Sequence, residues 1–93
     1  MEQKGERKPH ELSDSTSSAY ILVSCILGYE EEVINALKPL EGVKQIDQIY
    51  GIPYDLIVKV TSGTGRELEL VIKKIRSTKK IKSTQTMLVA RFA

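Results

Sequence analysis

The residue types that are scarce in this sequence exclude several classes of site. Among 93 residues there is no tryptophan, one phenylalanine, one histidine and one cysteine, Cys25. A single cysteine rules out a disulfide within the chain and a cysteine-based metal centre, and it is typical of a reducing compartment. The one histidine, His10, has no second histidine, cysteine or carboxylate at ligand spacing. We therefore expect no metal and no cofactor.

Long apolar runs are also missing. No stretch reaches the roughly 18 apolar residues that a membrane span needs, and the first ten residues are largely charged. The sequence thus predicts neither a membrane span nor a secretory signal, and we expect a cytoplasmic protein. Residues 1–18 hold one large aliphatic residue beyond the initiator, Leu12, so we expect a disordered polar tail there and a single folded domain over residues 19–93.

Candidate catalytic groups are few. An enzyme would need a base, a nucleophile or a metal set gathered in one place. Cys25 sits in the apolar run YILVSCIL, which is typical of a buried inert thiol. The consecutive Glu30, Glu31 and Glu32 point in different directions on a helix, so they suit the positive end of its dipole better than a catalytic pair. The sequence therefore predicts a protein that is not an enzyme.

Four stretches have the pattern of β-strands. Residues 19–27, AYILVSCIL, and 56–60, LIVKV, are apolar on both alternating faces, as expected for central strands. Residues 43–49, VKQIDQI, alternate with polar residues, which favours a strand near an edge. Gly51 and Pro53 then interrupt the chain and predict a hairpin. Residues 80–90, KIKSTQTMLVA, form the last predicted strand.

Two stretches have the period of amphipathic helices. In residues 29–38, Val33 and Leu37 lie on one face, and Pro39 ends the helix. In the second helix the apolar positions are Leu68, Val71, Ile72 and Ile75, and Thr64 with Glu67 forms a capping box at its start.

The order of these elements, β-α-β-β-α-β, predicts the fold. A weak internal repeat at a shift of 38 positions places Val33 on Val71 and Leu37 on Ile75. Two intercalated β-α-β units give an α+β, ferredoxin-like arrangement: a four-stranded antiparallel sheet with both helices on one face. Because the central strands are apolar on both sides, we expect the bare face to be a hydrophobic patch that pairs with a second copy, sheet to sheet. Such a small domain also gains from association.

The run GYEEEVINALKPLEGVKQIDQIYGIPYDLIVKV, followed by ELVIKKIRSTKKIKSTQTMLV, resembles the effector-binding (RAM) domain of the Lrp/AsnC transcription regulators, the feast/famine proteins of bacteria and archaea. The features are a small-residue helix start, the KPLEGV helix exit, the YG…YDLIVKV hairpin and the I-x-S-T-x-T strand start. The resemblance implies dimers through the sheets, octamers or similar rings, and amino acids bound between dimers. Full-length members carry a helix-turn-helix, which 18 polar residues cannot form, so the chain resembles a stand-alone RAM domain without specific DNA binding of its own.

The resemblance also implies an effector site between the hairpin and the start of the last strand. Asp55 would accept hydrogen bonds from the ammonium group of an amino acid. Hydroxyl groups, or backbone N–H groups left accessible by a glycine, would bind its carboxylate. The alternative is that Asp55 satisfies the turn and that the threonines are ordinary strand residues. The implied ligand-binding residues are Gly51, Tyr54, Asp55, Ser83, Thr84 and Thr86.

These expectations define a function together with its alternatives. We expect an amino-acid-binding and oligomerisation module whose partners are itself, an amino acid effector and possible full-length Lrp/AsnC regulators. An ACT-like regulatory domain, or a pure assembly domain acting through a partner protein, stays open because it shares the strand order. An RNA-recognition module also shares it, and residues 73–82 are basic, but LIVKV and ILVSC lack the stacking aromatics that such modules use.

Overall fold

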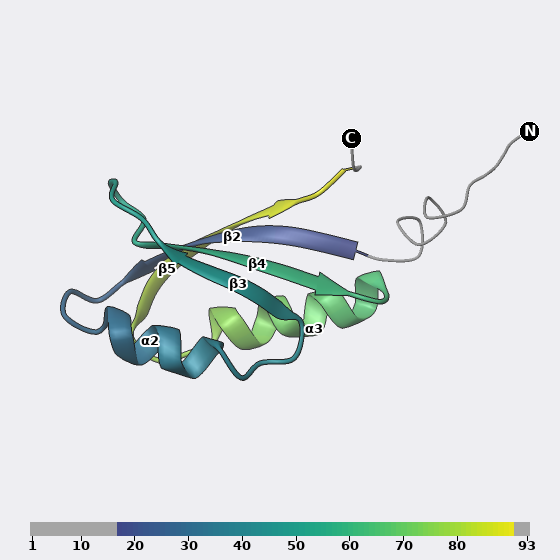
Figure 1. Cartoon of the computed structure of the whole chain (residues 1–93), viewed down its shortest axis with the longest axis horizontal. Helices are drawn as coiled ribbons and strands as arrows, with labels where there is room; N and C mark the ends of the chain where they lie inside the picture. Colours follow the sequence, from purple (N-terminus) through teal and green to yellow (C-terminus); the bar gives the residue numbers. More distant parts are fainter. Residues whose placement is uncertain (1–16, 91–93) are drawn as a thin grey trace, which may run out of the picture.

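The structure, a computed structural model, describes residues 17–90, which form one antiparallel sheet and two helices (Figure 1). The order of the strands across the sheet is β3-β4-β2-β5. This arrangement confirms the ferredoxin-like prediction. In chain order the elements are β2 (Ser17–Cys25), α2 (Glu30–Leu37), β3 (Val43–Gln48), β4 (Leu56–Ser62), α3 (Gly65–Arg76) and β5 (Ile81–Leu88).

The predicted polar tail lies almost wholly outside the described residues, since residues 1–16 are not among them. Ser17 and Ser18, which the sequence assigned to that tail, are the first residues of β2. At its other end β2 stops at Cys25, two residues before the predicted end. Gly28, with φ at +91°, turns the chain there toward α2 and leaves Leu27 90% exposed.

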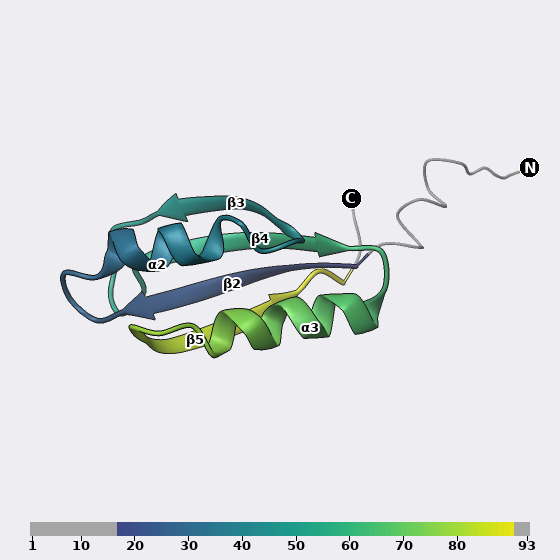
Figure 2. The same ribbon diagram turned by 90° about the horizontal axis from the view of Figure 1, so that it is seen from below.

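Both helices cover the same face of the sheet (Figure 2). α2 begins with three glutamates in its first turn and ends just before Pro39, as the sequence predicts. α3 begins after Thr64, whose side-chain oxygen accepts a hydrogen bond from the backbone N–H of Glu67 at 3.1 Å. The predicted helix cap is thus confirmed. In the described part of the chain, neither helix is long and apolar enough to cross a membrane.

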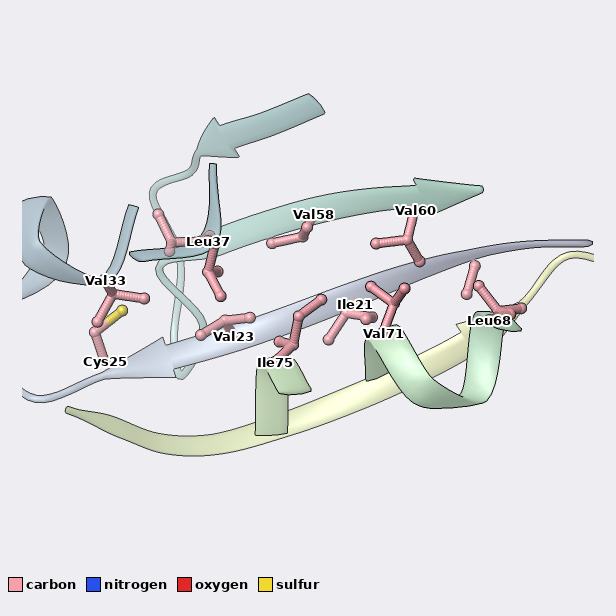
Figure 3. Close-up of a cluster of buried hydrophobic side chains, with 12 residues drawn as sticks. Ile21, Val23, Cys25, Val33, Leu37, Val58, Val60, Leu68, Val71 and Ile75 are labelled. Atoms are coloured by element: carbon pink, nitrogen blue, oxygen red, sulfur yellow. The ribbon is translucent and has the colours of Figure 1, made fainter. Parts of the chain in front are cut away.

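The hydrophobic core lies between the sheet and the helices (Figure 3). Alternate residues of β2 and β4 point toward the helices, because successive side chains of a strand face opposite sides. The buried set is Ala19, Ile21, Val23, Cys25, Val33, Leu37, Leu56, Val58, Val60, Leu68, Val71 and Ile75.

Cys25 belongs to this core, with 4% of its surface exposed. Burial raises the pKa of its thiol to about 11, and the negative charges of Asp55 and Glu30 contribute to the increase. Because the thiolate is the reactive form, Cys25 is an unreactive core residue at neutral pH.

Within residues 17–90, the other face of the sheet carries no helix, and its centre is apolar. Leu22 and Ile57 are register partners across β2 and β4, and Tyr20 lies between Lys59 and Met87. The ammonium of Lys59 lies 5.8 Å from the centre of the Tyr20 ring. We call this surface the open face.

The open face is more polar than the sequence analysis predicted. The residues that the edge strands place on this side are mainly polar, with Met87 of β5 as an apolar exception. Gln45 and Asp47 come from β3, and Ser83 and Gln85 from β5. An apolar centre is therefore bordered by polar edges.

The first and last described strands run side by side. Ala19 pairs with Leu88, and the N–H of Val89 donates to the carbonyl of Ser18 at 2.9 Å. Toward the opposite end, Ser24 pairs with Ser83, and the register shifts between Ser24 and Cys25. The beginning of β2 and the end of β5 thus meet at one corner of the sheet.

Candidate functional site

The β3–β4 hairpin, residues 49–55, projects beyond the sheet (Figure 1). Its base is closed by a hydrogen bond from the N–H of Ile49 to the carbonyl of Asp55 at 2.8 Å. At its tip Tyr50 and Ile52 are fully exposed, with relative exposures of 103% and 99%. Gly51 lies between them, and a methyl group added to it would meet nothing within 4 Å. The tip therefore presents apolar side chains that no other part of the described chain covers.

Asp55 fastens the base of the hairpin to the end of β2. Its N–H donates to the carbonyl of Val23 at 2.8 Å, and its Oδ2 accepts from the N–H of Cys25 at 2.7 Å. The second bond is charge-assisted and occupies a backbone N–H at the register shift of β2. A carboxylate has about four lone-pair sites, so this bond leaves acceptor capacity for a ligand. Asp55 thus has a structural role, which the sequence analysis gave as the alternative to ligand binding.

Tyr54 connects the hairpin to the far edge strand. Its hydroxyl donates to Oε1 of Gln85 at 3.0 Å. Because β2 lies between β4 and β5, this bond crosses β2. Gln85 shares the open face with Ser83, two residues earlier on β5. The sequence analysis missed Gln85, although the period of two in β5 would have placed it beside Ser83.

The register of β5 separates the three predicted hydroxyl residues. Ser83 pairs with Ser24 and belongs to the open face. Thr84 and Thr86 pair with Val23 and Ile21, whose side chains point to the helices, so both threonines lie on the opposite side of the sheet. The two groups therefore cannot line one pocket within a single copy.

The predicted site residues thus come together only in part. Asp55 and Ser83 both adjoin the Ser24–Cys25 end of β2, and the Tyr54 hydroxyl bonds Gln85, two residues after Ser83. Gly51 lies at the exposed tip, and the threonines face the helix side. No metal centre accompanies them: within residues 17–90, no three histidine, cysteine, aspartate or glutamate side chains come together.

The basic segment, residues 73–82, has partners within the domain. Lys73, Lys74 and Arg76 lie in the last turn of α3, where positive charge complements the helix dipole. The ammonium of Lys80 lies 4.2 Å from the centre of the Tyr29 ring, and the Lys80 carbonyl accepts from the N–H of Ile26 at 2.9 Å. Part of this segment therefore joins the β2–α2 turn to the α3–β5 turn.

Comparison with curated proteins finds similarity to part of a longer enzyme. The chain is 40% identical over 72 residues to homocitrate synthases of Saccharolobus islandicus and Saccharolobus solfataricus. The match takes up 76% of this chain and 15% of each synthase. The chain thus spans about a seventh of the length of these relatives. No protein-family model matches it.

Solved structures of similar fold include regulatory proteins. A crystal structure of an FFRP protein is 38% identical, with a TM-score of 0.72, covering 78% of this chain and 97% of that one. AsnC of E. coli has a TM-score of 0.75 at 20% identity, over 98% of this chain and 61% of its own. A feast or famine regulatory protein of M. tuberculosis, complexed with L-methionine, has a TM-score of 0.69 at 17% identity, over 96% of this chain and 59% of its own. At identities of 20% and 17%, the similarity of the last two structures to this chain shows a common fold.

Proposed function

Because the chain belongs to the Lrp/AsnC, or feast/famine, family of regulators, we propose that it is an assembly module that binds a free amino acid. The observation that carries the proposal is the position of the Asp55 carboxylate, where the hairpin, the end of β2 and the start of β5 meet. The L-methionine in the M. tuberculosis relative supports this ligand class. The module senses and assembles, and it has no catalytic role of its own.

The proposed site gives each end of an amino acid a partner. Asp55 accepts the ammonium with the lone pairs that Cys25 leaves free, and Ser83 donates its hydroxyl to the carboxylate. Tyr54, held by Gln85, forms one wall. Thr84, Thr86 and Gly51 contribute from a neighbouring copy, because one copy holds them on a different face or at the exposed tip.

Assembly follows from apolar surfaces that residues 17–90 of a single copy leave uncovered. Two copies pair through the apolar centre of the open face, where Leu22 and Ile57 are register partners. The exposed Tyr50 and Ile52 then contact a neighbouring dimer, which extends the assembly toward a ring such as an octamer. Burying such apolar surface stabilises association by about 25 cal/mol per Å².

Light scattering combined with thermal melting tests the proposal. We expect at least a dimer at 10 μM protomer, and we expect one of the twenty common amino acids to raise both the melting temperature and the oligomer mass. Ile57→Lys should lower the mass without unfolding the domain, whereas Lys44→Gln, at an exposed position of β3, should leave it unchanged. A folded monomer at 10 μM would contradict assembly. No thermal shift with any amino acid at millimolar concentration would contradict ligand binding.

A second candidate function has its own supporting observation. The homologous segment of the homocitrate synthases is part of an enzyme chain, so a module of this kind can act on an enzyme as well as on a DNA-binding regulator. Mixing the protein with a synthase that carries the segment, and with the same synthase lacking it, separates the two functions. Co-assembly with the synthase that carries the segment, but not with the one that lacks it, would favour a function on an enzyme. Co-assembly with a full-length feast/famine regulator and with neither synthase would favour a function in transcription.

A further inference from the structure

A hollow lies at the end of the domain opposite the hairpin. α2 has 8 residues and is about 12 Å long, whereas the 7 residues of β4 extend about 23 Å. α2 therefore covers only one end of β3 and β4, and beyond it the chain returns to β3 as a loop (Figure 2). Between this loop, the end of β4 and α3 there is a hollow of about 420 Å³.

The walls of the hollow are fixed by close backbone contacts. Gly42 adopts φ of +100°, and its carbonyl accepts from the N–H of Thr61 at 2.9 Å. A Cβ at Gly42 would lie 3.1 Å from Cγ2 of Val71, so the loop packs directly against α3. On the other side, Gly63 begins the turn into α3. These contacts fix the position of the loop that forms one wall of the hollow.

The lining carries equal numbers of opposite charges. Glu41 and Glu67 are acidic, and Lys44 and Lys74 are basic, and all four side chains are exposed. Leu70 adds an apolar surface, 53% exposed. A lining with no net charge does not select a simple anion or a simple cation. It suits a small molecule that carries both charges.

From these features we infer a second ligand site, which binds a free amino acid or a similar small zwitterion. The ammonium group lies against Glu41 and Glu67, the carboxylate against Lys44 and Lys74, and an apolar side chain against Leu70. A volume of 420 Å³ is at the small end of the roughly 300–1,000 Å³ of ligand pockets, which favours a single amino acid over a nucleotide. The site is independent of the proposed hairpin site, because β4 separates the two along its whole length.

Amide chemical shifts of the ¹⁵N-labelled full chain test this site separately from the hairpin. The N–H groups of Gly42 and Gly63 report on the hollow, and that of Gly51 reports on the hairpin tip. Each of the twenty common amino acids is titrated to 10 mM, with sodium acetate and methylammonium chloride as single-charge probes. We expect at least one amino acid to shift the amide signals of both Gly42 and Gly63, with shifts that saturate as its concentration rises. Neither single-charge probe should do so.

Charge-removing variants then identify the partners. Glu41→Gln and Lys74→Gln are exposed positions that should fold normally, and each should weaken binding about tenfold or more. Glu69→Gln and Lys73→Gln, exposed on α3 outside the lining, should bind as the unchanged protein does. Shifts at Gly51 alone would overturn this site and leave the hairpin proposal standing. Equal shifts with acetate, or unaltered affinity in both lining variants, would also overturn it.

Discussion

Replacing Asp55 separates its structural role from its proposed role in ligand binding. Asp55→Ala removes the acceptor of the Cys25 N–H, which belongs to a residue only 4% exposed. A buried donor left without a partner costs about 1–3 kcal/mol. For a domain of this size 1 kcal/mol corresponds to roughly 4–8 °C, so a loss of about 2 kcal/mol lowers the melting temperature by about 8–16 °C.

Asp55→Asn is the informative companion variant. Its side-chain oxygen still accepts from Cys25, so the unliganded fold should lose less than about 1 kcal/mol. The charge that would hold an ammonium is gone, however. A ligand at a hundredfold excess over Kd stabilises the unchanged protein by about 2.7 kcal/mol, and most of this increment should disappear in Asp55→Asn.

The assay is thermal or urea unfolding at one fixed protomer concentration, with and without the amino acid. Asp47→Ala is the control, because Asp47 is exposed and its carboxylate accepts a hydrogen bond from Gln45 Nε2 of its own strand, at 2.8 Å. If Asp55→Ala has the same melting temperature as the control Asp47→Ala, the bond to Cys25 contributes nothing to stability. If Asp55→Asn keeps the full ligand increment, Asp55 does not hold the ammonium.

Three further predictions concern stability. Burial raises the pKa of the Cys25 thiol from 9.0 to about 11, so the folded protein holds this proton more tightly than the unfolded chain. Its contribution to the free energy of unfolding is complete below pH 9 and is lost as the pH rises to 11. Between pH 8 and pH 10.5, urea unfolding should therefore show a smaller loss of stability in Cys25→Ala than in the unchanged protein. Thr64→Ala removes the cap of α3 and should cost about 1 kcal/mol by urea unfolding; an unchanged midpoint would contradict the cap. Ile75→Ala, at a fully buried position, should cost about 2–5 kcal/mol, whereas Leu70→Ala, 53% exposed, should cost much less; equal costs would contradict the core assignment.

The fold could be predicted because its signals are local. The period of Leu68, Val71 and Ile75 fixes the buried side of α3, and the Thr64 hydroxyl marks its start. The continuous apolar runs of β2 and β4 identify the two central strands, and the hairpin between β3 and β4 makes them neighbours. Once the helices share one face, the order of the strands follows.

The candidate site was less predictable because it depends on contacts between distant segments. The bond from Cys25 to Asp55 joins residues 30 positions apart, and that from Tyr54 to Gln85 joins residues 31 apart. Which face Ser83 and Thr84 take depends on the register of β5 against β2, and a shift of one residue would exchange them. The hollow beside Gly42 arises from the short length of α2 relative to β4. No local motif encodes either feature.

The corner where β2 begins and β5 ends makes this domain suitable for insertion into other proteins. The carbonyl of Ser18 and the N–H of Val89 are hydrogen-bonded, so two linkers attached there leave the domain only about 5 Å apart. A surface loop of a host enzyme can be opened by that distance without separating the strands or helices on either side of it. A biosensor made in this way would transmit the proposed ligand-dependent association of the inserted domains to its host.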